Sequence, residues 1–111
     1  MIKRKGKKGF VYILMNQEGT LFKYGASIDP QTRVRHINYD FKQNKFDIIH
    51  LMPSKDIFRL ENKIKHFMLR FGVFSEIFGD PIFTKDMVLK IANCAFYDDK
   101  KSFEEIYYQV V

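Results

Sequence analysis

Four side chains in this sequence have types that could together act on a phosphodiester bond: Tyr12, Lys23, Arg33 and Glu61. Hydrolysis of such a bond needs an activated water, neutralised phosphoryl oxygens and help for the leaving oxygen. The planar fork of an arginine fits a phosphate, and a single carboxylate can hold one Mg²⁺ that keeps several waters. Taken singly, each residue also has an ordinary explanation as a strand, helix-edge or surface residue, and Glu61 could simply pair with Lys65 at i+4. Only a common location would make them a site.

Two strands and the start of a helix must position the first three of these residues. The run Phe10–Asn16 is aromatic and β-branched, and Leu21–Ser27 follows it after a turn that contains Gly19, so we expect an antiparallel hairpin. Asp29 can cap a helix that has Pro30 at its first position. In that helix Arg33 lies beside the apolar stripe, half-turned toward the sheet.

Glu61 belongs to a second predicted helix. The apolar run Lys45–Pro53 is expected to form a third strand, and the helix follows from its cap at Ser54 to Gly72. Glu61 falls on the border of the apolar stripe of this helix. A carboxylate there needs a reason, because buried acids are costly unless they are paired or liganded.

The rest of the chain completes a mixed fold. Residues 73–83 are expected to be irregular or briefly extended, and Thr84 caps a third helix. The tail from Ser102 is open to two readings, since Ser102 and Glu105 form a capping box while the last residues are equally typical of a strand. We therefore predict an α+β fold: a small, central, antiparallel three-stranded sheet flanked by helices. Residues 9–111 form one domain, and residues 1–8 form a flexible basic arm.

Composition points to a polyanionic partner. The chain of 111 residues carries a net charge of +6, with a pI of about 9.4, and Lys7 and Lys8 of the arm would add non-specific affinity for phosphates. Solubility alone is the plain alternative. The single cysteine, Cys94, excludes an internal disulfide and favours a reducing, intracellular compartment. No apolar run predicts a membrane span or a secretory signal.

The motif order "VYIL…KYGAS.DP..R…IN", followed by "LE" and "SEIF", resembles the GIY-YIG nuclease superfamily over roughly residues 9–83. The closest likeness is to its divergent phage and large-DNA-virus branch, whose second motif has lysine first. Tyr12 precedes Lys23 by eleven residues, and Arg33 follows Gly25 by eight, as in that superfamily. Glu61 matches the glutamate of the later helix.

The resemblance implies a role for each matched residue. Tyr12 would be the general base or would position the attacking water, with its pKa lowered from about 10 by a neighbouring cation. Arg33 would bind the scissile phosphate, Glu61 would hold Mg²⁺ or Mn²⁺, and Gly25 would let the backbone pass closely. Lys23 stands where the main branch has its second tyrosine.

Five further residues are predicted to contact DNA, and the role of one acidic residue stays open. The residues predicted to contact DNA are Lys7, Lys8, Tyr24, Arg35 and His36. Tyr24 cannot replace Lys23, because adjacent strand residues point to opposite faces. Glu76 occupies the position, fifteen after Glu61, where the superfamily has an asparagine, and it could be a second acidic group or a structural residue.

Three functions follow from these expectations. The first is a metal-dependent DNA endonuclease, in which the four catalytic candidates converge in one concave basic cleft. The second is a GIY-YIG-fold protein that binds DNA and cleaves it weakly or not at all. The third is a phage or viral protein-interaction module. A homodimer or a host or viral protein partner is possible in each case, in the cytoplasm or in the nucleus of a host cell.

Overall fold

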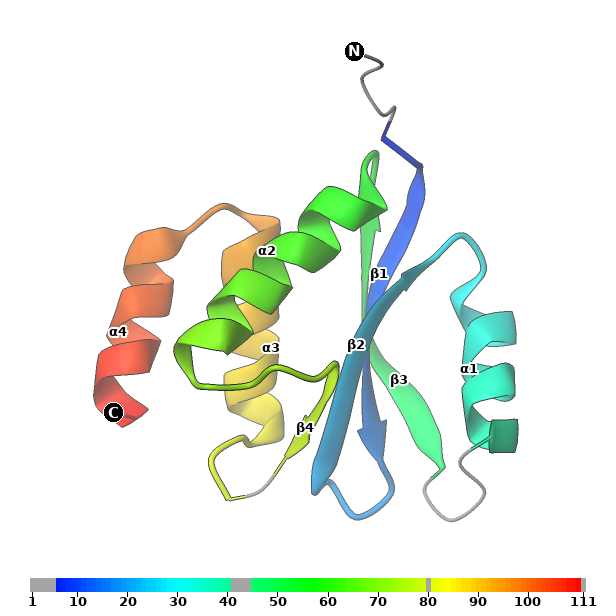
Figure 1. Ribbon diagram of the computed structural model, residues 1–111, viewed down its shortest axis with the longest axis horizontal. Helices are drawn as coiled ribbons and strands as arrows, with labels where there is room; N and C mark the ends of the chain where they lie inside the picture. The colour runs from blue at the N-terminus through cyan, green and yellow to red at the C-terminus, as the bar shows by residue number, and fades with distance from the viewer. Residues whose placement is uncertain (1–5, 41–44, 80, 111) are drawn as a thin grey trace.

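The computed structural model describes residues 6–40, 45–79 and 81–110 (Figure 1). Most of the predicted basic arm, residues 1–5, lies outside these ranges, while Lys7 and Lys8 are exposed. The elements follow one another as β1 (Gly9–Asn16), β2 (Leu21–Ser27), α1 (Pro30–Asp40), β3 (Phe46–Ser54), α2 (Ile57–Arg70), β4 (Ile77–Gly79), α3 (Lys85–Phe96) and α4 (Lys100–Val110). No helix in these ranges is long and apolar enough to cross a membrane.

The strands form one antiparallel sheet in the order β3-β1-β2-β4. The predicted α+β class is confirmed, but the sheet has four strands and not three, because part of the segment predicted as irregular or briefly extended pairs with β2. β4 has three residues and pairs only with Leu21, Phe22 and Lys23. So short a strand has no room for an alternating pattern, and its partner is more than fifty residues away in the sequence. The outer edge of β2 after Lys23 is therefore not paired by β4, and its backbone groups can bond to other parts of the protein.

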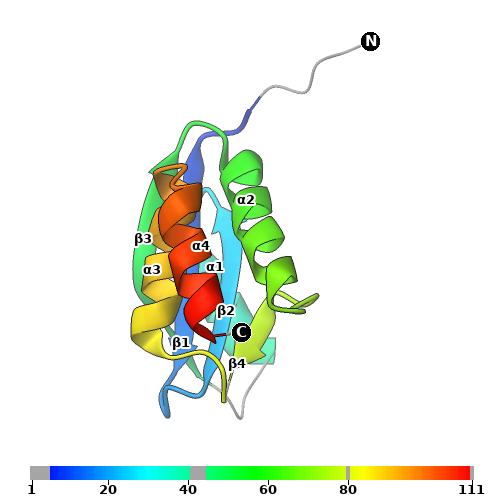
Figure 2. The same ribbon diagram turned by 90° about the vertical axis from the view of Figure 1, so that its left-hand side faces the viewer.

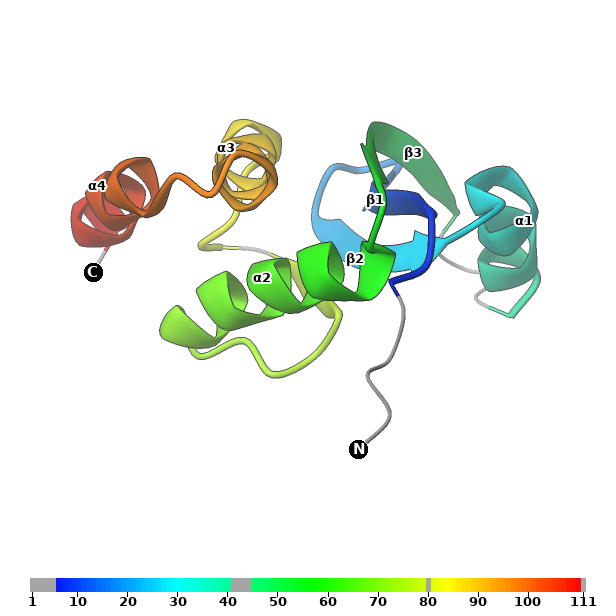
Figure 3. The same ribbon diagram turned by 90° about the horizontal axis from the view of Figure 1, so that it is seen from above.

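Helices cover both faces of the sheet. Seen from above, α1 lies on one side and α2, α3 and α4 lie on the other (Figure 3). The α1 face buries a small apolar cluster: Tyr12, Leu14, Val34, Ile37 and Phe46. The opposite face buries the larger core, to which β1, β2, β3, β4 and the last three helices all contribute. α4 is the outermost layer, over α3 (Figure 2), and its Phe103 stacks on Phe67 of α2 with ring centroids 4.0 Å apart.

Helix ends show which local predictions were right. Asp29 caps α1 as expected, accepting from the Thr32 amide at 3.3 Å. Thr84 caps α3, accepting from the Met87 amide at 3.3 Å. Gly72, the predicted end of the helix, lies two residues after α2 and has a left-handed backbone with φ of 78°. The α2 cap prediction was wrong by two residues. Asp56 accepts from the Arg59 amide, while Ser54 accepts from the amide of Asp56.

The tail is a helix and not a strand. Asp99 accepts hydrogen bonds from the Ser102 amide at 3.0 Å and from its hydroxyl at 2.6 Å. Ser102 therefore lies in the first turn of α4, so the predicted capping box at Ser102 was wrong. In this helix the Phe103 ring is part of the core and stacks on Phe67 of α2.

Candidate active site

The Tyr12 ring lies across Gly25. The two residues are cross-strand partners in β1 and β2, and the Tyr12 side chain is buried on the α1 face of the sheet. A Cβ atom on Gly25 would overlap the Tyr12 phenol oxygen and would lie 2.5 Å from its Cζ atom. Gly25 does not have a positive φ. The glycine is therefore needed to make room for the Tyr12 ring, whereas the sequence led us to expect only that the backbone passes closely at this position.

Arg33 approaches the same phenol from α1. Its guanidinium hydrogen-bonds to the Tyr12 hydroxyl, and both this bond and its positive charge lower the pKa of Tyr12. Burial has the larger effect and raises the pKa, as do the negative charges of Glu76 and Glu61. The net direction is upward, so the expected lowering by a protein cation is outweighed by burial. Tyr12 is a neutral phenol at physiological pH.

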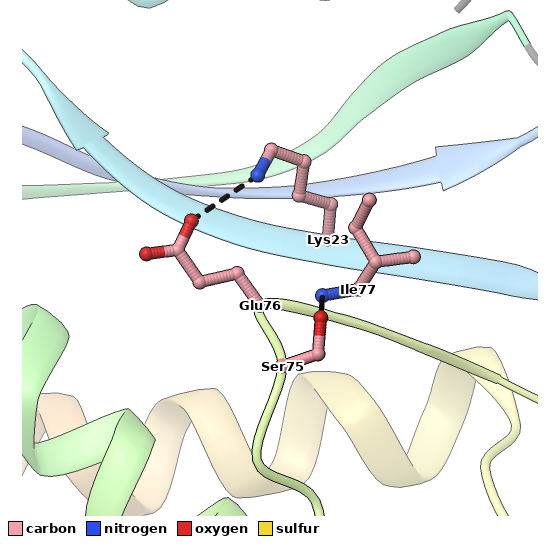
Figure 4. A network of polar contacts seen from close by, with 4 residues as sticks. All are labelled: Lys23, Ser75, Glu76 and Ile77. Carbon is pink, nitrogen blue, oxygen red and sulfur yellow. Dashed lines mark hydrogen bonds and ion pairs between the residues drawn. The ribbon is translucent and has the colours of Figure 1, made fainter.

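Lys23 makes an ion pair across the sheet edge with Glu76. Its Nζ atom lies 3.2 Å from the Glu76 carboxylate, as Figure 4 shows, and the two side chains are 13% and 53% exposed. The segment that carries Glu76 is also fixed by its backbone. The Tyr24 amide donates to the Glu76 carbonyl at 3.2 Å. The Ser75 hydroxyl accepts from the Ile77 amide at 3.1 Å (Figure 4). Glu76 is thus both a structural residue and a second acidic group, the two possibilities that the sequence left open.

Glu61 reaches the same edge from α2. Its half-buried carboxylate accepts a hydrogen bond from the backbone amide of Ala26, on the part of β2 that β4 does not pair. Burial and the charge of Glu76 raise the pKa of Glu61, whereas Lys23, the Ala26 amide and Lys65 lower it. The position of Glu61 on the border of an apolar stripe now has a reason, because the carboxylate satisfies an exposed strand edge.

A cleft of about 640 Å³ opens beside these groups, between α2 and the segment around Phe74 and Glu76. Its lining includes the Glu61 and Glu76 side chains, and Tyr24 contributes from the opposite face of the sheet to Tyr12. Carboxylates and cations both line it. The cleft is therefore not uniformly basic, in contrast to the sequence expectation, and Tyr12, Lys23 and Arg33 do not line it.

The comparisons with known proteins give one family. The protein-family model of the T5orf172 domain matches residues 9–80, which include all of the groups described above. The chain belongs to the T5orf172 domain family. Membership supports a phage nuclease-like or DNA-interacting domain, and so DNA as a partner. No curated protein and no solved structure matches the chain.

In this T5orf172 domain the four catalytic candidates are linked by charge, although only Glu61 of the four lines the cleft. Arg33, Glu61 and Glu76 each act electrostatically on Tyr12, and Lys23 and Glu76 act on Glu61. The sequence left two roles open for Glu76, from its position inside the "SEIF" segment fifteen residues after Glu61, but did not predict its ion pair with Lys23.

The residues predicted to contact DNA divide into two groups. Lys7, Lys8, Arg35 and His36 are exposed, and the last two lie on α1, the helix that carries Arg33. Tyr24 is only 3% exposed, packs near Phe78, and is part of the cleft lining rather than an open surface. Burial and the two nearby carboxylates raise the pKa of Tyr24 to about 12.

The carboxylates of the T5orf172 domain suit a hard, hydrated cation. Mg²⁺ is held by one or two carboxylates and retains several waters. Glu61 and Glu76 both line the cleft, and the charge of Glu76 acts on Glu61. Within residues 6–40, 45–79 and 81–110, no group of three or more acidic, histidine or cysteine side chains gathers that could enclose a metal ion. Glu61 and Glu76 are thus the two side chains of the lining that would hold a Mg²⁺ or Mn²⁺ ion whose other ligands are water.

Proposed function

We propose that this T5orf172 domain is a divalent-metal-dependent DNA endonuclease with a GIY-YIG-type site. The observation that carries the proposal is the contact of the Arg33 guanidinium with the Tyr12 phenol, on which the charge of the Glu61 carboxylate also acts. Tyr12 comes from β1, Arg33 from α1 and Glu61 from α2, and the charges of Arg33 and Glu61 both act on the Tyr12 hydroxyl.

The exposure, contacts and protonation of each residue suggest its role in cleavage. Arg33 is exposed on one side and hydrogen-bonded to Tyr12 on the other, so its fork can bind the scissile phosphate while holding the phenol in place. The neutral Tyr12 hydroxyl orients the attacking water through its oxygen. Lys23 neutralises charge on the phosphoryl oxygens once the phosphate competes with Glu76 for its ammonium. When bound at Glu61, Mg²⁺ supplies charge neutralisation and a water of lowered pKa.

The test is nicking of supercoiled plasmid DNA in Mg²⁺ or Mn²⁺. Wild-type protein should nick the plasmid, and Glu61→Gln should abolish nicking. Glutamine is the right substitution because its amide oxygen still accepts from the Ala26 amide, so the strand edge stays satisfied. Glu105→Gln, an exposed glutamate on α4, is the matched control and should nick like wild type. The proposal fails if wild-type protein binds DNA but leaves it intact across divalent metals.

A second candidate is a DNA-binding domain without cleavage, and one contact favours it. Lys23 replaces the second tyrosine of the main GIY-YIG branch and is already occupied by Glu76. This candidate expects DNA binding that weakens steeply with salt and persists unchanged in Glu61→Gln. Plasmid nicking that Glu61→Gln abolishes would rule it out.

A further inference from the structure

The cleft beside the proposed site is walled by aromatic rings. Tyr24 is buried against the core, while Phe58 on α2 is half-exposed and Phe74, in the segment after α2, is 85% exposed. These three rings come from three separate parts of the chain and line one concave space. The volume, about 640 Å³, falls within the range of small-molecule sites, roughly 300–1,000 Å³.

The charges of the cleft distinguish between possible occupants. Asp56 accepts from the Arg59 amide, Glu61 accepts from the Ala26 amide, and Glu76 is paired with Lys23. Every carboxylate of the lining therefore has a donor already, and together they repel a phosphate group from this space. An uncharged planar group with apolar faces and edge donors meets no such repulsion.

Two cations stand at exposed positions of the same lining. Arg59 and Lys65 are both on α2 and both exposed, so they can contact an anionic backbone that runs over the cleft. Aromatic rings beside cations form the combination that binds single-stranded nucleic acids, because every base has a face that can stack. Carboxylate oxygens such as those of Glu61 can in addition accept from the amino group of a base.

We propose that this cleft holds one unstacked nucleobase of a DNA strand, next to the phosphate that Arg33 binds. The inference rests on the proposed function, since Glu61 and Glu76 belong both to the cleft and to the cleavage site. It names the substrate class as DNA with unpaired nucleotides, whether single-stranded, branched or mismatched. A base inside a duplex has both faces stacked, and its removal from the stack costs free energy that an unpaired base does not require.

The test measures binding without divalent metal, so that it is independent of cleavage. Fluorescence anisotropy in EDTA should show that wild-type protein binds a single-stranded oligonucleotide more tightly than a blunt duplex of the same length. Phe74→Ala should weaken single-strand binding by roughly 5- to 10-fold, the lower range for loss of one stacking ring, and should leave duplex binding unchanged. Phe74 is so exposed that its truncation leaves the core intact. Tyr108→Ala on α4, 70% exposed, is the matched control and should change neither affinity.

A second variant reports on stacking directly. The chain has no tryptophan, so Phe74→Trp introduces a unique fluorophore into the cleft. Its emission should be quenched by the single-stranded oligonucleotide, whereas the emission of Tyr108→Trp should not. The inference is overturned if Phe74→Ala keeps wild-type single-strand affinity or if Phe74→Trp is not quenched. Quenching without plasmid nicking would support the base site and defeat the nuclease proposal, and nicking without quenching would do the reverse.

Discussion

Replacing Gly25 with alanine should push the Tyr12 ring out of its place. The added methyl group would overlap the phenol oxygen of Tyr12 and approach its Cζ and Cε1 atoms at 2.5 and 3.0 Å. Tyr12 cannot swing aside freely, because it is buried with Leu14 and Val34 under α1. We therefore expect Gly25→Ala to destabilise the protein and to separate the phenol from Arg33.

The magnitude follows from two opposing effects. Overpacking a buried site by one methyl group costs about 1–3 kcal/mol. Alanine is the better strand residue and recovers about 0.5–1 kcal/mol relative to glycine. The net change in the free energy of unfolding should be a loss of about 0–2.5 kcal/mol. The upper part of this range is expected, because the overlap involves the ring of Tyr12 and not the end of a flexible side chain.

The assay is urea denaturation, followed by circular dichroism, of a double-mutant cycle with Tyr12→Val. Valine is a strand former that does not reach across Gly25, so in that background Gly25→Ala should stabilise by about 0.5–1 kcal/mol. The sign of the effect should thus reverse between the two backgrounds. If Gly25→Ala stabilises the protein with Tyr12 present, or if its effect is equal in both backgrounds, the steric reading of the tyrosine-glycine pair is wrong.

Three further outcomes are expected. The raised pKa of Glu61 means that the folded protein holds this proton more tightly than the unfolded chain, so the ionised carboxylate lowers stability above that pKa. Glu61→Gln should therefore stabilise the protein at neutral pH. In urea denaturation, this gain in the free energy of unfolding should shrink as the pH falls toward about 4. Glu76→Gln should lower the pKa of Glu61, observed by NMR titration of its carboxyl carbon, because it removes a nearby negative charge. Phe103→Ala should lower the free energy of unfolding, measured by urea denaturation, by about 3–5 kcal/mol, because the buried ring stacks on Phe67 with centroids 4.0 Å apart. A loss within about 0.5 kcal/mol, as expected for the exposed Tyr108→Ala, would contradict this prediction.

Sequence patterns predicted correctly those strands, helices and caps that are determined by residues close together in the chain. The hairpin, the third strand and the helix stripes follow from alternation and helical spacing, and the caps at Asp29 and Thr84 from side chains that bond within one turn. The cap of α2 was misplaced because Ser54 and Asp56 are both good acceptors two residues apart. Only the backbone geometry distinguishes them.

The features that the sequence did not predict depend on contacts between segments far apart in the chain. β4 exists because the chain reverses after Gly72 and meets β2, which no local pattern of three residues can show. The same reversal brings Glu76 to Lys23, so the role of Glu76 was not readable from its position in the sequence. The spacing of Tyr12 and Arg33 did suggest that they meet, but the direction of the Tyr12 pKa is set mainly by burial, which is a property of the packed fold.

The boundary of the matched segment also limits how this domain can be transplanted. Residues 9–80 contain every group of the proposed site, yet Ile91 and Ala95 of α3 and Phe103 of α4 fill the core on the far side of the sheet. A fusion protein that borrowed only residues 9–80 would carry the proposed site on a sheet whose larger apolar face is covered by α2 alone. Such a graft would need α3 and α4, or replacement helices of matching shape, before its site could be engineered.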